Sequence, residues 1–263
     1  MLTESEREEL TSPTGMLAWT ELPRALLEFS TFAAVSPFMS GAPKGDGHDV
    51  LFLPGFLWSD RSTRLMRHYL AQLGYRTHGW ELGSNFGPST IGETGQILAE
   101  RIEAIIRDGS GQLSLVGHSL GGIMARTFAL QNPASIRQLI CIGSPFVPEP
   151  RGVNATVGRL HGWLTGVPPE ADASVCAEAL EIPSTAIFSH WDGLVSPVVC
   201  TENTTEQAQN ICVYGSHLGM MTNPAVFYAL ADRLAQPQDE RVPFNPVGWR
   251  RAFYPELDKS SFQ

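Results

Sequence analysis

The segment that most constrains the fold is residues 117–121, a G-x-S-x-G pentapeptide with the sequence GHSLG. Residues 112–116, just before it, are short and mostly apolar, which is typical of a buried strand. Residues 122–130, just after it, have helical spacing and contain good helix formers. A strand, a tight turn and a helix in this order predict that Ser119 lies in a strained turn, with its hydroxyl above a sheet.

The glycines of the pentapeptide suit such a turn. Side chains two positions either side of Ser119 would collide there, and Gly117 and Gly121 have none. The serine would lie at the N-terminus of the following helix, where the helix dipole favours developing negative charge. The alternative is an ordinary glycine-rich turn, but the flanking strand and helix favour a nucleophile elbow.

Strand-like and helix-like segments alternate along most of the chain. This alternation predicts an α/β fold, with a mostly parallel sheet of about six strands flanked by helices. Active sites in such sheets lie at the carboxyl ends of the strands, where the pentapeptide is found. The expected strands are 49–54, 75–80, 112–118, 136–142, 184–188 and 211–214. The expected helices, besides 122–130, are 21–38, 60–73, 89–107 and 223–235.

The length of the chain predicts one domain over residues 1–263. Residues 146–183 interrupt the alternation, and a stretch of this length without regular structure is uncommon unless it is functional. We expect a small lid or cap there; the alternative is a surface excursion with one or two short helices. Residues 236–263 form a C-terminal tail whose packing the sequence does not indicate.

Residues 1–47 are expected to be an N-terminal extension that contains the helix 21–38. Its apolar residues recur at helical spacing, which predicts that this helix packs across the sheet edge through its apolar face. The residues expected on that face are Leu22, Leu26, Leu27, Phe29, Phe32 and Val35.

The charge of the chain argues against several classes of partner. A formal net charge of -9 disfavours binding to nucleic acid or to an anionic membrane surface. The first nine residues are acidic, unlike a secretory signal, and no apolar run approaches the roughly 18 residues of a membrane span. We therefore expect a cytoplasmic protein without a stable membrane anchor, although a secreted mature chain would look the same.

The cysteines do not form a disulfide framework, and no zinc-binding motif occurs. Cys200 and Cys212 flank a polar loop and could meet, but in a cytoplasmic protein we expect free thiols. The sequence thus predicts no metal site.

A serine nucleophile needs a base within hydrogen-bond reach and a group that orients the base. In a fold with this elbow the order along the chain is serine, acid, histidine. His217 follows the last expected strand between two glycines, and Asp192 follows the strand 184–188, so we expect these two to complete a triad with Ser119. The alternatives are a solvated histidine, an aspartate that caps a turn, and Glu206 as the acid.

An acyl-transfer site also needs N–H donors aimed at the oxyanion. One expected donor is the backbone N–H of Leu120, the residue after the serine. The other is the N–H of Phe56, in the loop after the first expected strand, where Gly55 allows close approach of the backbone. A plain proline–glycine turn at this loop is the alternative, and the two interpretations are compatible.

Four motifs together resemble the α/β-hydrolase superfamily and, within it, bacterial lipases and carboxylesterases. They are residues 53–56 (LPGF), 116–122 (VGHSLGG), 192–195 (DGLV) and 215–217 (GSH), and residues 142–145 (IGSP) are also similar. The resemblance spans about residues 48–235 and implies neither a metal nor an organic cofactor. It departs from the family at Pro54–Gly55, where relatives often have His-Gly.

The resemblance implies a serine carboxylic-ester hydrolase that acts on small-molecule esters with apolar acyl groups. The side chains expected to line the pocket are Leu57, Trp58, Trp163, Leu218 and Met220. A thioesterase, an amidase or peptidase, or a perhydrolase could use the same triad, and a non-catalytic binding protein is a further alternative. Epoxide hydrolases and dehalogenases of this superfamily have an aspartate at the elbow, so Ser119 argues against both.

Overall fold

The structure is a computed structural model that describes residues 13, 15–35, 39, 41–109, 111–147, 152–165, 178–202, 205–237 and 242–255. These residues contain a sheet of six strands in the order β2-β1-β3-β4-β5-β6, with every neighbouring pair parallel. This is the predicted α/β architecture. The strands are β1 (Asp49–Leu53), β2 (Arg76–Gly79), β3 (Leu113–His118), β4 (Ile136–Ile142), β5 (Ser184–Phe188) and β6 (Ala208–Cys212).

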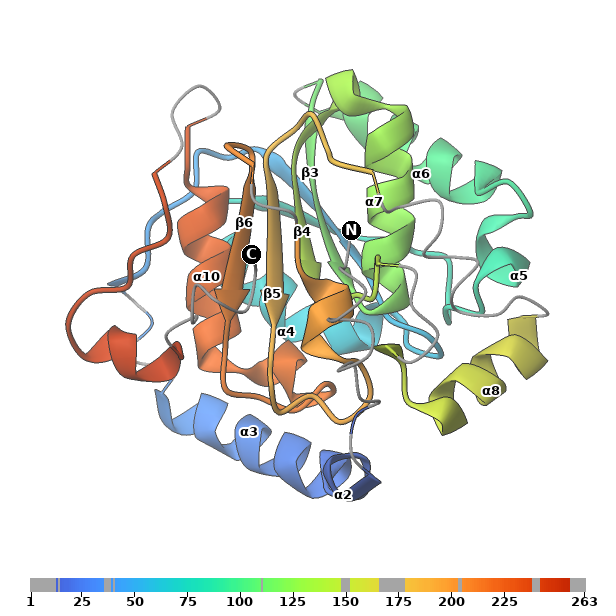
Figure 1. Cartoon of the computed structure of the whole chain (residues 1–263). Coiled ribbons are helices and arrows are strands. Elements are labelled where there is room, and N and C mark those ends of the chain that lie inside the picture. The colour runs from blue at the N-terminus through green and yellow to red at the C-terminus, as the bar shows by residue number, and fades with distance from the viewer. Residues whose placement is uncertain are drawn as a thin grey trace.

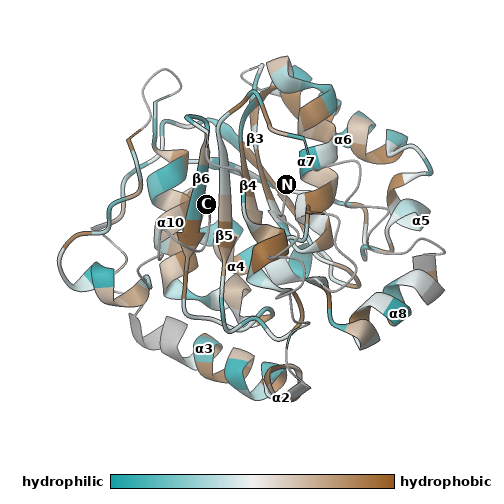
Figure 2. Ribbon diagram, viewed as in Figure 1, coloured by the Kyte–Doolittle hydropathy of each residue, from teal (hydrophilic) through white to brown (hydrophobic). Residues whose placement is uncertain are grey.

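Alternate residues of β1 enter different halves of the core. Val50 and Phe52 pack with apolar residues of α4 and α10, whereas Leu51 and Leu53 pack with those of α6 and α7. Helices therefore cover both faces of the sheet, and apolar residues lie on the strands and on the helices against them (Figure 2). These helices are α4 (Asp60–Gln72), α6 (Gln96–Asp108), α7 (Leu120–Gln131) and α10 (Pro224–Leu234).

Most elements match the sequence prediction within two residues, residues 36–38 of the expected helix 21–38 lie outside the described part, and two elements differ more. The expected helix 89–107 is split into α5 (Pro88–Ile91) and α6, because Gly92 and Gly95 adopt φ values of 89° and 77° that a helix does not allow. The last strand is β6 and begins earlier than the expected strand 211–214.

The N-terminal helices α2 (Gly15–Trp19) and α3 (Glu21–Val35) lie with α8 (Ala155–Thr165) near the carboxyl ends of the strands (Figure 1). The prediction that α3 packs through its apolar face is wrong. Glu21 is buried, with 3% of its surface exposed, because its carboxylate is bonded to loop amides. The expected apolar contacts are instead exposed: Leu22, Leu26, Leu27 and Phe29 are 57% to 70% exposed, and the side chains of Phe32 and Val35 lie outside the described residues.

The expected lid, 146–183, contains α8, and residues 148–151 and 166–177 of it lie outside the described part. His161 of α8 packs edge-on against Phe56, with ring centroids 4.9 Å apart. A moving lid stays a prediction. In the tail, the hydroxyl of Tyr254 donates to the carbonyl of Ala225 in α10 at 2.7 Å, so the described part of the tail returns to the domain. None of the described helices has the length and apolar character that crossing a membrane requires.

Candidate active site

Ser119 lies in the strained turn that the sequence predicts, between β3 and α7. Its φ of 52° is one of three positive values among the described non-glycine residues. Its N–H donates to the carbonyl of Ile142 in β4 at 2.9 Å, which ties the turn to the neighbouring strand. A Cβ atom at Gly121 would overlap the backbone of Leu53 and Pro54. Only glycine therefore allows the start of α7 to approach the end of β1 this closely.

Asp192 and His217 form a buried pair at the carboxyl ends of β5 and β6. Asp192 Oδ2 lies 2.6 Å from His217 Nδ1, and each residue is 3% exposed. The other carboxylate oxygen, Oδ1, accepts the N–H groups of Leu194 at 2.8 Å and Val195 at 2.7 Å. Asp192 is thus held by its own loop and presents one oxygen to the imidazole, which fixes the ring with its Nδ1–H toward the carboxylate.

The surroundings of His217 favour its charged form. Burial opposes protonation, but the charge and hydrogen bond of Asp192, with a smaller contribution from the Glu21 carboxylate, raise the pKa of His217 above its ordinary value. An imidazolium at this position is therefore stabilised by two carboxylates. This is the charge state that a general base acquires when it accepts a proton.

The elbow and the histidine loop meet through His118. Its ring is 4.9 Å from that of His217 by centroids, and its Nε2–H donates to the His217 carbonyl at 3.1 Å. A Cβ atom built on Gly143, at the end of β4, would lie 3.2 Å from His217 Nδ1. His217 therefore packs against the end of β4 and against His118, the residue before Ser119, although no hydrogen bond joins Ser119 and His217 in the part of the chain that the structure describes.

The loop after β1 lies against the elbow. A Cβ atom on Gly55 would be 3.2 Å from Ser119 Cβ. The loop is a tight turn in which Trp58 N donates to Gly55 O at 3.0 Å, and Leu57 has a φ of 66°. This places Phe56 at the tip of a turn next to the serine. At the elbow, the Leu120 N–H opens α7, where helix amides have no intrahelical acceptor.

Asn85, which the sequence analysis missed, braces this loop. It is fully buried, and its Nδ2 donates to the Pro54 carbonyl at 2.7 Å. Its backbone also accepts from Leu57 N at 2.7 Å and donates to Trp58 O at 2.8 Å. All three bonds reach residues 27 or more positions earlier in the chain, so no local pattern indicates them.

The expected pocket residues differ in how exposed they are. Leu57 and Trp58 are 43% and 45% exposed on the loop beside the serine. Leu218 is partly buried, while Met220 is fully buried in the core beneath the histidine loop and has no open surface. The side chain of Trp163 lies outside the described residues. A cavity of about 310 Å³ between α5, α6 and α7 has Leu120 among its lining residues, but none of Ser119, Phe56 and His217.

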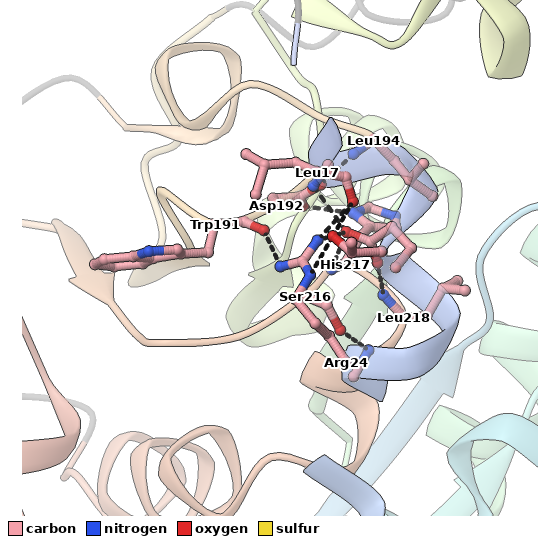
Figure 3. Close-up of polar contacts among 12 residues, drawn as sticks. Leu17, Arg24, Trp191, Asp192, Leu194, Ser216, His217 and Leu218 are labelled. Carbon is pink, nitrogen blue, oxygen red and sulfur yellow. Dashed lines mark hydrogen bonds and ion pairs between the residues drawn. The ribbon is translucent and has the colours of Figure 1, made fainter. Parts of the chain in front are cut away.

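A second set of missed residues lies on α3. Glu21 accepts the N–H groups of Gly193 at 2.8 Å, His217 at 3.2 Å and Leu218 at 3.3 Å. Arg24 bonds Glu21 at 2.9 Å and also donates to the carbonyls of Leu17 and Trp191. Figure 3 shows Arg24 reaching into this group of contacts around Asp192 and His217. No local pattern in the sequence indicates these contacts, because the partners of Glu21 at Gly193 and His217 are more than 170 residues away in the chain.

The remaining candidates from the sequence do not take part in the Asp192–His217 contact. Cys200 and Cys212 are free and buried, as expected. Within the described ranges, no group of three or more His, Cys, Asp or Glu side chains could hold a metal ion. Glu206, the alternative acid, is exposed in the loop before β6.

Comparison with known proteins is consistent with this geometry. Residues 50–211 match the model of a family described as "alpha/beta hydrolase fold". This range contains the elbow and Asp192, but it leaves out α3 and His217. The chain is also similar to epoxide hydrolase 2 of Siraitia grosvenorii, with 31% identity over 129 residues. That match covers 46% of this chain and 40% of the relative, so the chain matches less than half of the relative's length.

Several solved structures share the fold. A pyrethroid hydrolase from Sphingobium faniae JZ-2 aligns with a TM-score of 0.53 and 17% identity, over 73% of this chain and 99% of that one. A structure from work on the metagenome-derived lipolytic enzymes LipS and LipT aligns with a TM-score of 0.51 and 15% identity, over 68% and 89%. A thioesterase domain from the curacin biosynthetic pathway aligns with a TM-score of 0.50 and 17% identity, over 72% and 92%. At these identities the likeness shows the fold alone.

Proposed function

Because the chain belongs to the α/β-hydrolase family, we propose that it is a serine hydrolase of carboxylic esters that acts through Ser119, His217 and Asp192. The observation that carries the proposal is the buried 2.6 Å contact between Asp192 and His217, whose ring lies 4.9 Å from that of His118, the residue before a serine held at a φ of 52°. An acid that orients an imidazole next to a strained serine is the arrangement that activates a hydroxyl for attack.

In the first half of the reaction, Ser119 Oγ attacks the ester carbonyl while His217 Nε2 takes the hydroxyl proton. Asp192 holds the imidazole and stabilises its positive charge without accepting the proton. The N–H groups of Leu120 and Phe56 would donate to the oxyanion. The intermediate collapses, the ester C–O bond breaks, and the alcohol leaves with the proton from His217.

In the second half, a water molecule attacks the acyl group on Ser119 and gives its proton to His217. The acid departs, and Ser119 Oγ recovers the proton. Leu57 and Trp58, both about half exposed beside the serine, support an apolar acyl group as the substrate.

The test is hydrolysis of p-nitrophenyl esters from acetate to palmitate by wild type, Ser119→Ala and Ser89→Ala. Ser89 is exposed on α5 and serves as the matched control. We expect Ser119→Ala to lose activity by a factor on the order of 10³ or more, and Ser89→Ala to match wild type. Turnover by Ser119→Ala at a rate near wild type would contradict the proposal.

Two alternatives are separated by further substrates. The fold is shared with a thioesterase domain, so a kcat/KM for an acyl thioester well above that for the matching ester would favour thioester hydrolysis. The relative named epoxide hydrolase 2 suggests a second reaction, but this chain has Ser119 at the elbow where epoxide hydrolases of the superfamily have an aspartate. Labelling of Ser119 by a fluorophosphonate, without ester turnover, would point to thioesters or amides.

A further inference from the structure

Helix α3 is attached to the domain through its charged residues. Glu21, Arg24 and Glu28 are the charged side chains of α3, and all three bond the loops that carry Asp192 and His217. Its large apolar residues Leu22 and Leu26 are 66% and 70% exposed. An amphipathic helix ordinarily buries its apolar side, so the polar contacts of α3 decide where this helix lies.

The carboxylate of Glu21 joins the two loops to each other. Oε1 accepts from Gly193, the residue after Asp192, and also from the N–H of His217 itself, while Oε2 accepts from Leu218. Two loops that follow different strands are thereby bonded to one side chain. A shift of either loop would break a bond at Glu21, so the carboxylate fixes the spacing between the proposed acid and base.

All four contacts of Glu21 are donors. Three are backbone N–H groups, and the fourth is the Arg24 guanidinium at 2.9 Å. A carboxylate, which only accepts, satisfies such a set, whereas an amide would turn its NH₂ toward a donor. The Glu21 carboxylate is only 3% exposed, so water hydrates it little, and the Arg24 guanidinium supplies the positive charge that balances it.

We propose that Glu21 is a positioning residue that acts on His217 from the N-terminal helix, by holding both loops and by placing a second negative charge near the imidazole. The inference rests on the proposed function, since it concerns the same triad. Glu21, like His217, lies outside residues 50–211, the part of the chain that matches the family model.

The charge of Glu21 gives this role a signature that a purely structural contact lacks. The charged and titratable groups near His217 are Asp192 from the loop after β5, His118 from β3, and Glu21 of α3 with its partner Arg24 at 2.9 Å; Glu28 bonds the adjacent Ser216 N–H at 2.7 Å. Among these, Asp192 and Glu21 raise the pKa of His217. Removal of the Glu21 charge should therefore lower that pKa and move the acid limb of the pH profile to lower pH.

The test compares wild type with Glu21→Gln, Glu21→Asp and the control Glu28→Gln. For each we would measure kcat and KM on the p-nitrophenyl ester that wild type hydrolyses fastest, from about pH 5 to about pH 9, and a thermal melt. Glu21→Gln should lower kcat roughly 10-fold to 100-fold with little change in KM, and should shift the acid limb down. Glu21→Asp keeps the charge but is one methylene shorter, so kcat should fall while the acid limb stays.

Glu28→Gln alters the same helix and the neighbouring amide, so its acid limb should stay where wild type has it. A Glu21→Gln protein that melts earlier but keeps the wild-type kcat and acid limb would overturn the proposal. If Glu21→Gln does not fold, a Glu21→Asp protein with wild-type kcat would overturn it. The role of Glu21 can be tested even if the proposed function fails, which is the case if wild type shows neither ester turnover nor fluorophosphonate labelling. The pKa of His217 would then be measured by proton NMR titration. Equal pKa values in wild type and Glu21→Gln would overturn the proposed role of Glu21.

Discussion

The imidazole of His118 donates its Nε2–H to the backbone carbonyl of His217 at 3.1 Å. The residue before the proposed nucleophile is therefore bonded to the residue proposed as its base. The bond requires a proton on Nε2 of His118, which both the neutral Nε2–H tautomer and the imidazolium carry. Burial and the positive charge that His217 can carry lower the pKa of His118 to about 3, so at ordinary pH its ring is neutral and the Nε2–H tautomer makes the bond.

This low pKa predicts a pH dependence of stability. The folded pKa of His118, about 3, is below its ordinary value of 6.5, so between these values the unfolded chain holds a proton that the folded chain lacks. The free energy of unfolding should fall as the pH is lowered through this window, with His118 contributing about 1.4 kcal/mol per pH unit. His118→Gln, which keeps an N–H donor, should show a shallower fall in urea unfolding measured across the window.

The control is His68→Gln, because His68 is exposed on α4. The slope of its free energy of unfolding against pH should match that of wild type. Equal slopes for wild type and His118→Gln would contradict the conclusion that His118 is neutral in the folded protein.

Replacement of the proposed acid should act on both the rate and the pH profile. Asp192→Asn removes the charge that raises the pKa of His217 and turns an amide toward Nδ1, so kcat should fall by about 10⁴-fold and the acid limb should move to lower pH. Kinetics on p-nitrophenyl esters, with fluorophosphonate labelling of Ser119, measure both effects.

Glu206→Gln is the matched control, because Glu206 is the other acid that the sequence allows in this role. It is exposed in the loop before β6, and its variant should keep the wild-type rate. A loss of activity in Glu206→Gln, with Asp192→Asn still active, would reverse the assignment.

The strands and the elbow could be predicted from the sequence because their signals are local. A short continuous run of apolar residues identifies β1, and the pentapeptide with its flanks identifies Ser119. The order of acid and histidine after the serine then indicates Asp192 and His217. Their contact at 2.6 Å depends on the parallel order of the strands, which the alternation also predicts.

The orientation of α3 could not be predicted in this way. Amphipathic periodicity assumes that apolar residues are buried, but Glu21 is buried here because backbone amides and Arg24 satisfy its oxygens. Those amides belong to Gly193 and His217, more than 170 residues later in the chain, so no spacing rule connects them. In contrast, the split between α5 and α6 has a local cause, the two glycines at 92 and 95.

Asn85 was missed for the same reason as Glu21, and its removal should affect the oxyanion loop. Asn85→Ala leaves the Pro54 carbonyl without its buried donor, so the free energy of unfolding should fall by about 1–3 kcal/mol. Because the loop carries the Phe56 N–H, kcat should fall more than KM rises. Gln112→Ala removes a side-chain bond to the carbonyl of Ala134, near the opposite end of β3, and should leave kcat unchanged.

Gly55→Ala tests the approach of this loop to the serine without removing any polar group. The added Cβ would lie 2.9 Å from His118 Nδ1 and 3.2 Å from Ser119 Cβ, so the loop must move away from the elbow. A shift of this kind separates the Phe56 N–H from the oxyanion position, and the loss of one such donor costs on the order of 10²-fold in kcat. Gly83→Ala is the control, because a Cβ there meets no atom within 4 Å, although its φ of 82° adds backbone strain. If both Gly55→Ala and Gly83→Ala retain the wild-type kcat, the loop after β1 does not supply the oxyanion donor.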